Sequence, residues 1–323
     1  MLDDKKIAVV IPAYNEEQLI ESTVNGIPAF IDKIVIVDDC SADETVNRAG
    51  SLLLRQPDRI ILIEHVVNQG VGGAIASGYI WCRDHDMDIA VVMAGDAQMD
   101  PNDLPALLEP LLCDRSDYAK GNRLFSGDAW NLIPKVRYLG NAVMSLLTKI
   151  ASGYWQVADS QCGYTAINRK ALAAIDWAQM YKRYGQPNDL LVRLNVNNFR
   201  VRDVPTRPIY NIGEKSGVKP IRMIPRLSLL LLKLFVWRMF QKYIIRDFHP
   251  LVFFYLFGFS LSLPGFLLGI WLVIYRIFIG YVSVTSALFA ALLIISGLQF
   301  LLFAMWFDMD YNLRTNGRSE DRR

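Results

Sequence analysis

The sequence has few of the residues that build disulfide frameworks, zinc sites or hydrolase triads. Its 323 residues include four cysteines and three histidines. The cysteines lie 42, 31 and 49 residues apart, so no Cys-x-x-Cys pair is available to hold a metal or to carry out redox chemistry. His65, His85 and His249 show no ligand spacing and no nearby Ser or Cys constellation. The composition therefore argues against a zinc enzyme and a disulfide-rich secreted protein, and it predicts reduced cysteines and structural or surface histidines.

The chain also lacks a large charge of either sign. Its 34 Lys and Arg are balanced by 32 Asp and Glu, a net charge of +2, which argues against a general nucleic-acid binder. Because 52% of the residues are hydrophobic and only 20% are charged, the chain is not a disordered or low-complexity protein. Residues 221–323 contain eleven basic and five acidic residues, whereas residues 1–220 are net acidic. Two regions with different partners are therefore expected.

Charged side chains are missing altogether from two long stretches in the last quarter of the sequence. Residues 251–275 contain none in 25 positions, residues 277–307 contain none in 31, and Arg276 lies between them. A stretch of about 20 apolar residues is enough to cross a bilayer. Helices buried in soluble cores seldom reach that length without a charge. The sequence therefore predicts two membrane spans joined by a short turn.

The charges that flank these stretches indicate their orientation. Basic residues precede the first span and follow the second, while the connecting turn has only Arg276. The positive-inside rule then places both flanks in the cytoplasm, and the short hairpin suits a bacterial or archaeal plasma membrane. The expected organisation is a cytoplasmic domain over 1–220, a juxtamembrane helix over 221–249, two transmembrane helices over 250–308 and a cytoplasmic tail over 309–323.

The predicted juxtamembrane helix combines apolar and basic residues. Ile221–Phe248 is rich in Leu, Ile and Phe and contains six basic residues, which is typical of an amphipathic helix that contacts anionic headgroups in the membrane interface. Packing against the soluble domain is the alternative. Pro250 marks the expected start of the first span. Within that span, Gly265 and Gly269 form a Gly-x-x-x-Gly motif that could join helices inside the hairpin or in a homo-oligomer.

The first 210 residues alternate strand-like and helix-like segments. Four apolar runs are each followed by a polar turn and a helix-like segment: Ile7–Ile11, Lys33–Val37, Ile60–Ile63 and Ile89–Met93. This order is typical of an α/β domain with a largely parallel sheet. Because ligands of such sheets bind beyond the carboxyl ends of the strands, the four turns are expected to form a binding edge.

Two of these turns are acidic and one is rich in glycine. Asp38 and Asp39 close the second strand and Asp96 closes the fourth, so carboxylates from two strands are expected in one crevice. A lone Asp at a strand end is usually a helix cap, but several together suit Mg2+ or Mn2+ that holds a diphosphate. The turn Gly70-Val-Gly-Gly73 fits neither a Walker A loop nor a dinucleotide fingerprint, which leaves a helix N-terminus with close backbone approach.

Five motifs in a fixed order resemble the family 2 glycosyltransferases of the dolichyl- or polyprenyl-phosphate sugar synthase type. They are Pro12-Ala-Tyr-Asn-Glu-Glu17, Val37-Asp-Asp-Cys-Ser41, Asn68-Gln-Gly70, Gly95-Asp-Ala-Gln98 and Asp159-Ser-Gln-Cys-Gly-Tyr164. The resemblance covers about residues 5–220. It implies a GT-A fold, which is a Rossmann-like nucleotide-sugar domain, together with a nucleotide-sugar donor and a divalent metal, Mg2+ or Mn2+. The two predicted spans fit those members of the family that have a C-terminal hairpin.

On the donor side, the resemblance implies a nucleotide pocket and a metal site. The residues that correspond to the donor pocket are Pro12, Tyr14, Glu16, Val37, Asp39, Gly95, Asp96 and Lys215. Asp96 and Gln98 correspond to ligands of the metal and the diphosphate, and Asp96 is one of two implied catalytic residues. The family's Asp-x-Asp motif is Ala94-Gly95-Asp96 here, so its first carboxylate is missing. This departure leaves open weaker metal binding, completion of the metal shell by Gln98 and the diphosphate, or a non-catalytic descendant.

On the acceptor side, the resemblance implies a cradle for a lipid phosphate. Arg123, Lys135 and Arg137 correspond to this cradle, with ordinary surface positions as the alternative. A phosphate oxygen is already nucleophilic, so the reaction needs no strong general base. Asp159, the second implied catalytic residue, is therefore expected to orient the acceptor or the sugar.

These expectations combine into an inverting glycosyltransferase that moves a sugar from a UDP- or GDP-hexose to a polyprenyl phosphate at the cytoplasmic face of the membrane. Two alternatives remain open at this point. A processive polysaccharide synthase would share the GT-A motifs, but it would be expected to show a Gln-x-x-Arg-Trp motif and more spans, which the sequence lacks. A membrane scaffold that binds a nucleotide sugar without turnover is conceivable because of Ala94.

Overall fold

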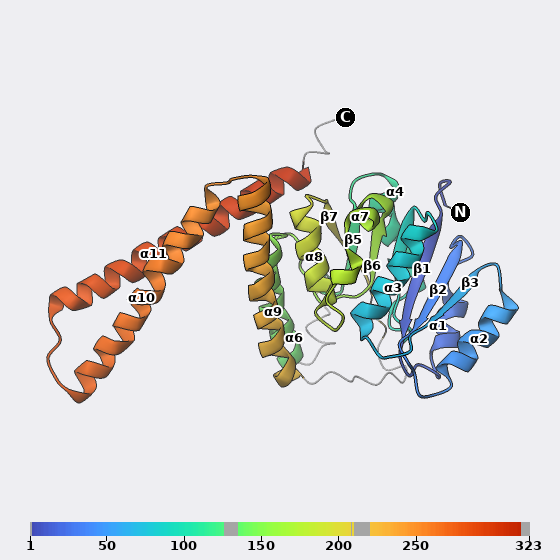
Figure 1. Cartoon of the computed structure of the whole chain (residues 1–323), viewed down its shortest axis with the longest axis horizontal. Helices are drawn as coiled ribbons and strands as arrows, with labels where there is room; N and C mark the ends of the chain where they lie inside the picture. The colour runs from blue at the N-terminus through green and yellow to red at the C-terminus, as the bar shows by residue number, and fades with distance from the viewer. Residues whose placement is uncertain (1, 126–134, 208, 210–219, 318–323) are drawn as a thin grey trace. The chain divides into compact units, whose positions relative to one another are not determined.

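The computed structural model describes residues 2–125, 135–207, 209 and 220–317 (Figure 1). Within helices, only the backbone is described at 135–139, 141, 220–223 and 315–317. The chain divides into two compact units, the first formed by Met1–Phe235 with Asn316–Arg323 and the second by Val236–Thr315.

The first unit is built on a seven-stranded mixed sheet with the order β3-β2-β1-β4-β6-β5-β7. The strands are β1 (Ile7–Ala13), β2 (Lys33–Asp38), β3 (Ile60–Glu64), β4 (Ile89–Val92), β5 (Tyr118–Asn122), β6 (Thr165–Asn168) and β7 (Val201–Pro205). Strands β1 to β4 pair in parallel, as the four apolar runs predict. Strand β6 is antiparallel to both of its neighbours, and β7 is parallel to β5.

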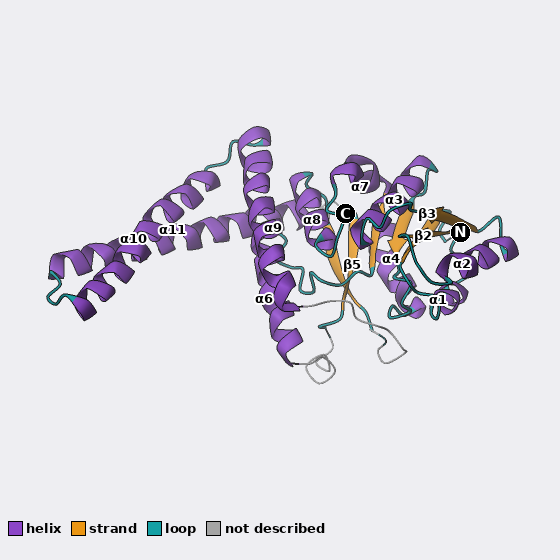
Figure 2. Cartoon of the chain, turned by 60° about the horizontal axis from the view of Figure 1, so that its bottom comes forward, coloured by secondary structure: helices purple, strands orange, loops and turns teal. Residues whose placement is uncertain are grey.

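The sheet is buried on both faces, which explains why its strands are continuous apolar runs rather than alternating ones. In β1, Ile7, Val9 and Ile11 belong to the core on one face, while Ala8 and Val10 belong to the core on the other. The first core also contains residues of α1, α2 and α4, and the second contains residues of α3, α7 and α8. The result is a three-layer α/β domain with the sheet between two layers of helices (Figure 2).

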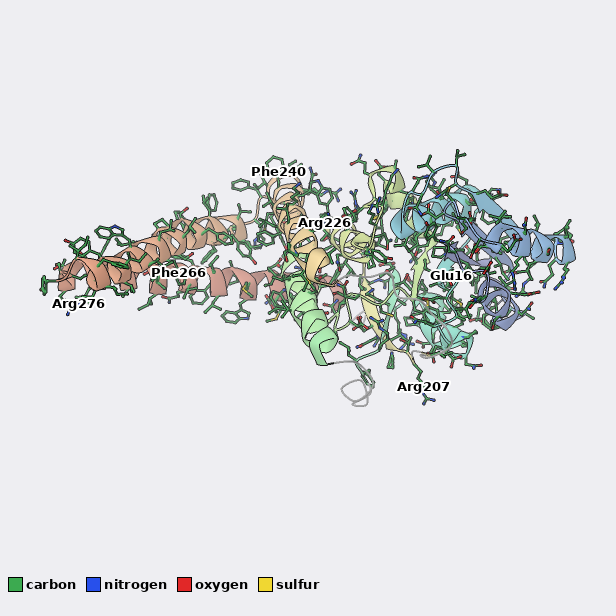
Figure 3. The ribbon with its side chains drawn as sticks, turned by 90° about the horizontal axis from the view of Figure 1, so that it is seen from below. Glu16, Arg207, Arg226, Phe240, Phe266 and Arg276 are labelled. Carbon is green, nitrogen blue, oxygen red and sulfur yellow. The ribbon has the colours of Figure 1, made fainter. Side chains whose placement is uncertain are left out.

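The helices of this unit follow the strands in the alternating order that the sequence indicates. They are α1 (Ile20–Gly26), α2 (Thr45–Arg55), α3 (Val71–Asp84), α4 (Leu104–Leu112), α6 (Lys135–Ser152), α7 (Arg169–Ala174), α8 (Gln186–Val196) and α9 (Pro220–Phe240), with 3-10 turns at Pro101–Asp103 and Trp177–Gln179. Helix α6 packs against α9 through Met144, Ala151, Leu227 and Leu231. Arg226 lies on the exposed side of α9 (Figure 3).

The second unit contains two long apolar helices that overlap the two uncharged stretches. Helix α10 (Leu251–Phe278) and helix α11 (Val284–Gly317) follow the last turns of α9 and a π-helical turn, η3 (Gln241–Arg246). The spans Leu251–Phe278 and Val284–Arg314 are long and apolar enough to cross a membrane. Their exposed side chains include Phe266, which is labelled in Figure 3.

Small residues allow the two long helices to approach closely. A Cβ atom added at Gly265 would lie 2.9 Å from the backbone nitrogen of Ile294, and one added at Gly297 would lie 2.4 Å from that of Ser262. Gly269 is less tightly packed, since its nearest neighbour is the Cδ1 atom of Ile294 at 3.7 Å. The Gly-x-x-x-Gly motif therefore contributes to packing inside the hairpin, mainly through its first glycine.

Polar side chains join the base of the hairpin in a cluster that the sequence does not predict. Arg238 donates to both carboxylate oxygens of Asp308 at 2.9 and 2.8 Å, and both side chains are fully buried. The Tyr243 hydroxyl donates to Asp308 at 2.5 Å, and Lys242 donates to the Asn312 side-chain oxygen at 2.9 Å. Two of the six basic residues of the predicted juxtamembrane helix, Arg238 and Lys242, are thus buried against α11 rather than exposed.

Candidate active site

The ends of β1 and β2 place the predicted base and ribose pocket at one edge of the sheet. Pro12 and Val37 are direct partners in the parallel register, and the Asp39 backbone N–H donates to the Ala13 carbonyl at 2.9 Å. Tyr14 follows β1 in the turn and is half exposed. The structure therefore brings these predicted donor-pocket residues together, because parallel strands end at the same edge.

The end of β4 lies beside the same turns. Gly95 donates from its backbone N–H to the Pro12 carbonyl at 3.3 Å, and its Cα position faces Glu16, whose Cγ would lie 3.5 Å from an added Cβ atom. Burial, together with the neighbouring charges of Asp96 and Asp43, raises the pKa of Glu16 to about 7. Mutually repelling carboxylates at a sheet edge are the surroundings in which a cation is favourable.

The turn after β4 presents the predicted metal ligands. The Gln98 backbone N–H donates to Asp96 Oδ1 at 3.1 Å, which orients the carboxylate. Within the described part of the chain, no group of three or more His, Cys, Asp and Glu side chains could hold a metal by itself. The oxygen donors of Asp96 and Gln98 fit Mg2+ or Mn2+ only as part of a shell that a bound diphosphate completes.

Three residues in the turns of this edge have left-handed backbone conformations without being glycine. They are Asn15, Cys40 and Ala97, with φ angles of 56°, 63° and 55°. Asn15 connects two turns, because its N–H donates to Ser41 and its side-chain oxygen accepts from the Ala42 N–H, both at 2.9 Å. Such conformations are unfavourable for residues with a Cβ atom and concentrate at functional sites.

His65 lies in a buried chain of side chains, which the sequence analysis did not foresee. Its Nδ1 atom is 2.8 Å from Asp39 Oδ1, and its Nε2 atom is 2.8 Å from the Ser77 hydroxyl. The prediction that no Ser lies near the histidines is therefore wrong for His65. The signal that could have located it is the parallel register, since Asp38 pairs with Glu64 and the next residues along both strands are adjacent.

The glycine-rich turn serves protein packing. Gly70 has a φ angle of 87°, and a Cβ atom added at Gly72 would lie 2.3 Å from the Tyr181 carbonyl oxygen. The Gly73 N–H donates to the Lys182 carbonyl at 3.0 Å, so this backbone segment occupies the N-terminus of α3. The close backbone approach that the glycines predict is made by residues of the chain itself.

The acceptor side contains a buried ion pair between two of the predicted site residues. Arg123 donates through Nε to Asp159 Oδ2 at 2.7 Å and through a terminal nitrogen to Oδ1 at 3.1 Å. Burial alone would raise the pKa of Asp159, but the charge and hydrogen bonds of Arg123 outweigh it and lower that pKa. Asp159 is therefore an ionised group in a fixed orientation, which agrees with a positioning role and not with proton abstraction.

A second layer of contacts supports this pair and connects it to the donor side. Lys120 is fully buried in β5 and donates from Nζ to the Cys162 carbonyl, in the same loop as Asp159. The Tyr164 hydroxyl at the end of that loop donates to the Asp100 carbonyl at 3.0 Å, next to the turn after β4. Lys120 begins the segment Lys120-Gly-Asn-Arg123 on the predicted acceptor side, but its burial cannot be predicted, because a lysine inside a strand gives no indication of burial.

The remaining predicted residues are only partly covered by the structure. Lys135 and Arg137 lie in the first turn of α6, where the backbone alone is described. Lys215 lies outside the described residues. Their predicted contacts with phosphate or diphosphate remain predictions.

The mixed seven-stranded sheet between two layers of helices defines a transferase domain of the GT-A type. The model of glycosyl transferase family 2 matches residues 8–176, and the chain belongs to this family. It is 32% identical over 219 residues to the UDP-N-acetylglucosamine–dolichyl-phosphate N-acetylglucosaminyltransferase of Methanococcus voltae, covering 64% of this chain and 87% of that protein. It is 28% identical to the undecaprenyl-phosphate mannosyltransferase of Micrococcus luteus, covering 62% of this chain and 82% of that protein.

Solved structures support the fold assignment. Glucosyl-3-phosphoglycerate synthase from Mycobacterium tuberculosis, in complex with Mn2+ and UDP-glucose, is 20% identical and covers 73% of this chain and 79% of its own, with a TM-score of 0.52. At this identity the likeness concerns the fold. The predicted GT-A domain, followed by two helices that could span a membrane, is thus confirmed.

Proposed function

We propose that this chain transfers a sugar, with inversion, from a UDP- or GDP-hexose to a polyprenyl phosphate at the cytoplasmic face of a membrane. The observation that carries the proposal is the convergence of the turns after β1, β2 and β4 at one sheet edge, linked through Tyr164 to the buried pair of Arg123 and Asp159. Two relatives are named for transfer to dolichyl or undecaprenyl phosphate, and this supports the same acceptor class here.

On the donor side, the pocket is proposed to hold the nucleotide between the two strand ends. Pro12, Val37 and Tyr14 would contact the base and ribose, and Asp39 would accept from the base. Glu16 and Gly95 border the diphosphate end, and Lys215 is proposed to close over it. The name of the M. voltae relative supports a UDP-sugar.

A divalent cation is proposed to bind through Asp96 and Gln98 together with the donor diphosphate. When bound, Mg2+ or Mn2+ offsets the negative charge that develops on the departing nucleoside diphosphate. Asp96 is oriented for this role by the Gln98 N–H. Burial and, after it, the charges of Asp96 and Asp43 raise the pKa of Glu16 at the same place, where a cation would be favourable. The Mn2+ in the structural neighbour supports a metal of this class.

The acceptor phosphate is proposed to lie on the side of Arg123, Lys135 and Arg137. Because Arg123 is already bound bidentately to Asp159, it is a rigid donor and not a mobile one. The phosphate oxygen attacks the anomeric carbon as the bond to the nucleoside diphosphate breaks, and Asp159 holds Arg123 in place. No proton needs to be removed from a phosphate that is already ionised.

The membrane anchor is proposed to be the hairpin of α10 and α11, with residues 250–308 inside the bilayer, residues 1–220 and 309–323 in the cytoplasm and residues 221–249 at the interface. The apolar surface of both helices supports this arrangement. The excess of basic residues before α10 and after α11 supports the orientation. Homo-oligomer formation through the hairpin is a further possibility of this arrangement.

The experiment that tests the proposal uses the full chain in detergent with radiolabelled UDP- and GDP-sugars and a polyprenyl phosphate. We expect label in the organic phase when Mg2+ or Mn2+ is present and loss of label with EDTA. Asp96→Ala should reduce transfer at least a hundred-fold, whereas Asp84→Ala, at an exposed helix position, should leave it unchanged. Nucleotide binding without transfer to any acceptor would instead identify a binding scaffold and overturn the proposal.

A further inference from the structure

Asp39 is the proposed ligand of the donor base, yet its carboxylate is almost fully engaged by the protein. Oδ1 accepts from His65 Nδ1 and from the Gln69 backbone N–H, both at 2.8 Å. Oδ2 accepts from the Gly70 backbone N–H at 2.7 Å. A carboxylate has about four acceptor positions, two on each oxygen. Among the described residues, these three contacts leave one position, and it lies on Oδ2.

His65 determines which carboxylate oxygen of Asp39 keeps an acceptor position for the base. A carboxylate accepts only, so the proton of the imidazole lies on Nδ1, and Nε2 then accepts from the Ser77 hydroxyl at 2.8 Å. The His65 and Asp39 side chains are 6% and 4% exposed, so water competes little for either contact. The ring is held from both ends, by α3 on one side and by the turn after β2 on the other.

The backbone on both sides fixes the same arrangement. The His65 N–H donates to the Asp38 carbonyl at 2.9 Å, and the Asn68 side chain donates to the Asp39 carbonyl at 3.0 Å. The carboxylate therefore cannot rotate to exchange its oxygens without breaking several buried hydrogen bonds. The single remaining acceptor position has a fixed location.

Nucleobases differ in the number of donors that they offer to a carboxylate. Uracil has one N–H, between two carbonyl groups. Guanine has an N–H and an adjacent amino group, which are satisfied together only when both oxygens of a carboxylate are available. A base with two adjacent donors would leave one of them unsatisfied at Asp39, and an unsatisfied buried donor is unfavourable.

We propose that His65, held by Ser77, is a positioning residue that occupies Asp39 Oδ1 and thereby makes the site selective for a uracil-type base over guanine. This inference rests on the proposed function, because it takes Asp39 as the base ligand. It assigns a role to two residues outside the five motifs, and it narrows the donor to the uridine diphosphate sugars.

The test measures the binding of UDP and GDP to the full chain in detergent with Mn2+, by titration calorimetry. Wild-type protein is expected to bind UDP at least about ten-fold more tightly than GDP, the effect of one buried hydrogen bond. Equal affinity for the two nucleotides, or tighter binding of GDP, would overturn the selectivity.

Variants of His65 test the positioning role. His65→Leu frees one acceptor position on Oδ1 and leaves the carboxylate less firmly held, so UDP binding should weaken about ten-fold while GDP binding stays the same or improves, and the preference should collapse. His65→Asn keeps a donor near the Nδ1 position and should retain most of the preference. A residue that merely fills space would lower the affinity for both nucleotides equally, and that result would contradict the proposal. His85→Leu, at an exposed histidine on the same chain, is the matched control.

If His65→Leu does not fold, Ser77→Ala tests the same positioning role. Alanine is a good helix former, so α3 should be retained. Loss of the Nε2 partner should reduce the preference for UDP several-fold, and a wild-type preference in this variant would contradict the role of Ser77. These binding measurements do not depend on transfer. Sugar transfer from GDP-sugars alone would overturn this inference and leave the proposed function intact, whereas binding of neither nucleotide would overturn the proposed function itself.

Discussion

At the scale of single residues, the turns of the active-site edge hold conformations that their side chains disfavour. Ala97, with a φ angle of 55°, lies between Asp96 and Gln98 and has no side-chain group that could compensate for the strain. Its conformation places the Gln98 N–H against the Asp96 carboxylate. The local cost is therefore linked to the orientation of the proposed metal ligand.

Ala97→Gly should stabilise the folded protein, because glycine adopts left-handed conformations freely. The expected gain in the free energy of unfolding is about 1 kcal/mol, reduced somewhat by the greater entropy of glycine in the unfolded chain. Ala142→Gly is the matched control, since this exposed position inside α6 is helical and the same change should cost about 1 kcal/mol there. Denaturant unfolding followed by tryptophan fluorescence measures both, and equal signs for the two variants would contradict the strain argument.

A second residue-scale prediction concerns pH. Burial raises the pKa of Asp203 to about 6, and its Oδ2 atom accepts from the Ala158 N–H at 2.7 Å. A carboxyl whose pKa is higher in the folded state than in the unfolded state stabilises the fold below its unfolded pKa, near 4, and this stabilisation is lost as pH rises through about 6. Asp203→Asn removes the titration. As pH rises from 4 to 6, the melting temperature of the variant should therefore increase relative to that of the wild type. A difference in melting temperature that stays constant over this range would contradict the assignment.

At the scale of elements, the sequence predicts best what depends on periodicity and worst what depends on register. The four apolar runs become β1 to β4 with almost the expected bounds, and their parallel pairing brings the motif turns together. The antiparallel insertion of β6 between β4 and β5 is not visible in the sequence, because the pattern of a four-residue strand does not indicate the direction in which it pairs. The contact of His65 with Asp39 was missed for a related reason, since it depends on which residues of β2 and β3 lie side by side.

At the scale of elements, replacing a glycine of α3 and a glycine of α2 by alanine should change the free energy of unfolding in opposite directions. Gly72→Ala would place a Cβ atom 2.3 Å from the Tyr181 carbonyl oxygen, so the segment that covers the start of α3 must move. We expect a loss of about 2 kcal/mol in the free energy of unfolding. Gly50 in α2 has no atom within 4 Å of an added Cβ, so Gly50→Ala should stabilise the protein by about 0.5–1 kcal/mol. Thermal melts of the two variants distinguish a packing role of Gly72 from simple helix propensity.

At the scale of the whole molecule, the chain combines a GT-A transferase domain with a helical hairpin, and the polar cluster at the base of the hairpin lies inside the second unit. Two separate sequence features pointed to this organisation, the motif order and the two uncharged stretches. What they did not indicate is the partner of Arg238. Asp308 lies just beyond the second uncharged stretch, 70 residues away, and only the antiparallel return of α11 brings the two together.

Breaking this pair should destabilise the hairpin strongly, because a buried charge would lose its partner. Asp308→Ala is expected to cost about 3–5 kcal/mol, and Arg238→Ala a similar amount. The double variant should cost clearly less than the sum, since it leaves neither charge isolated. The amount of folded, monodisperse protein recovered in detergent at increasing temperature measures all three. Additive losses would mean that the two side chains contribute independently.

The pairing of Arg238 with Asp308 also ties the lengths of α10 and α11 to each other. Between these two residues the chain runs out along α10 and back along α11, so their contact requires that both helices cover the same distance to within about one helical turn. An insertion in one helix alone would rotate and displace Asp308 away from its partner. Adaptation to a thicker or thinner bilayer would therefore require matched changes in the lengths of both helices. The two helices should then change length together in evolution and not independently.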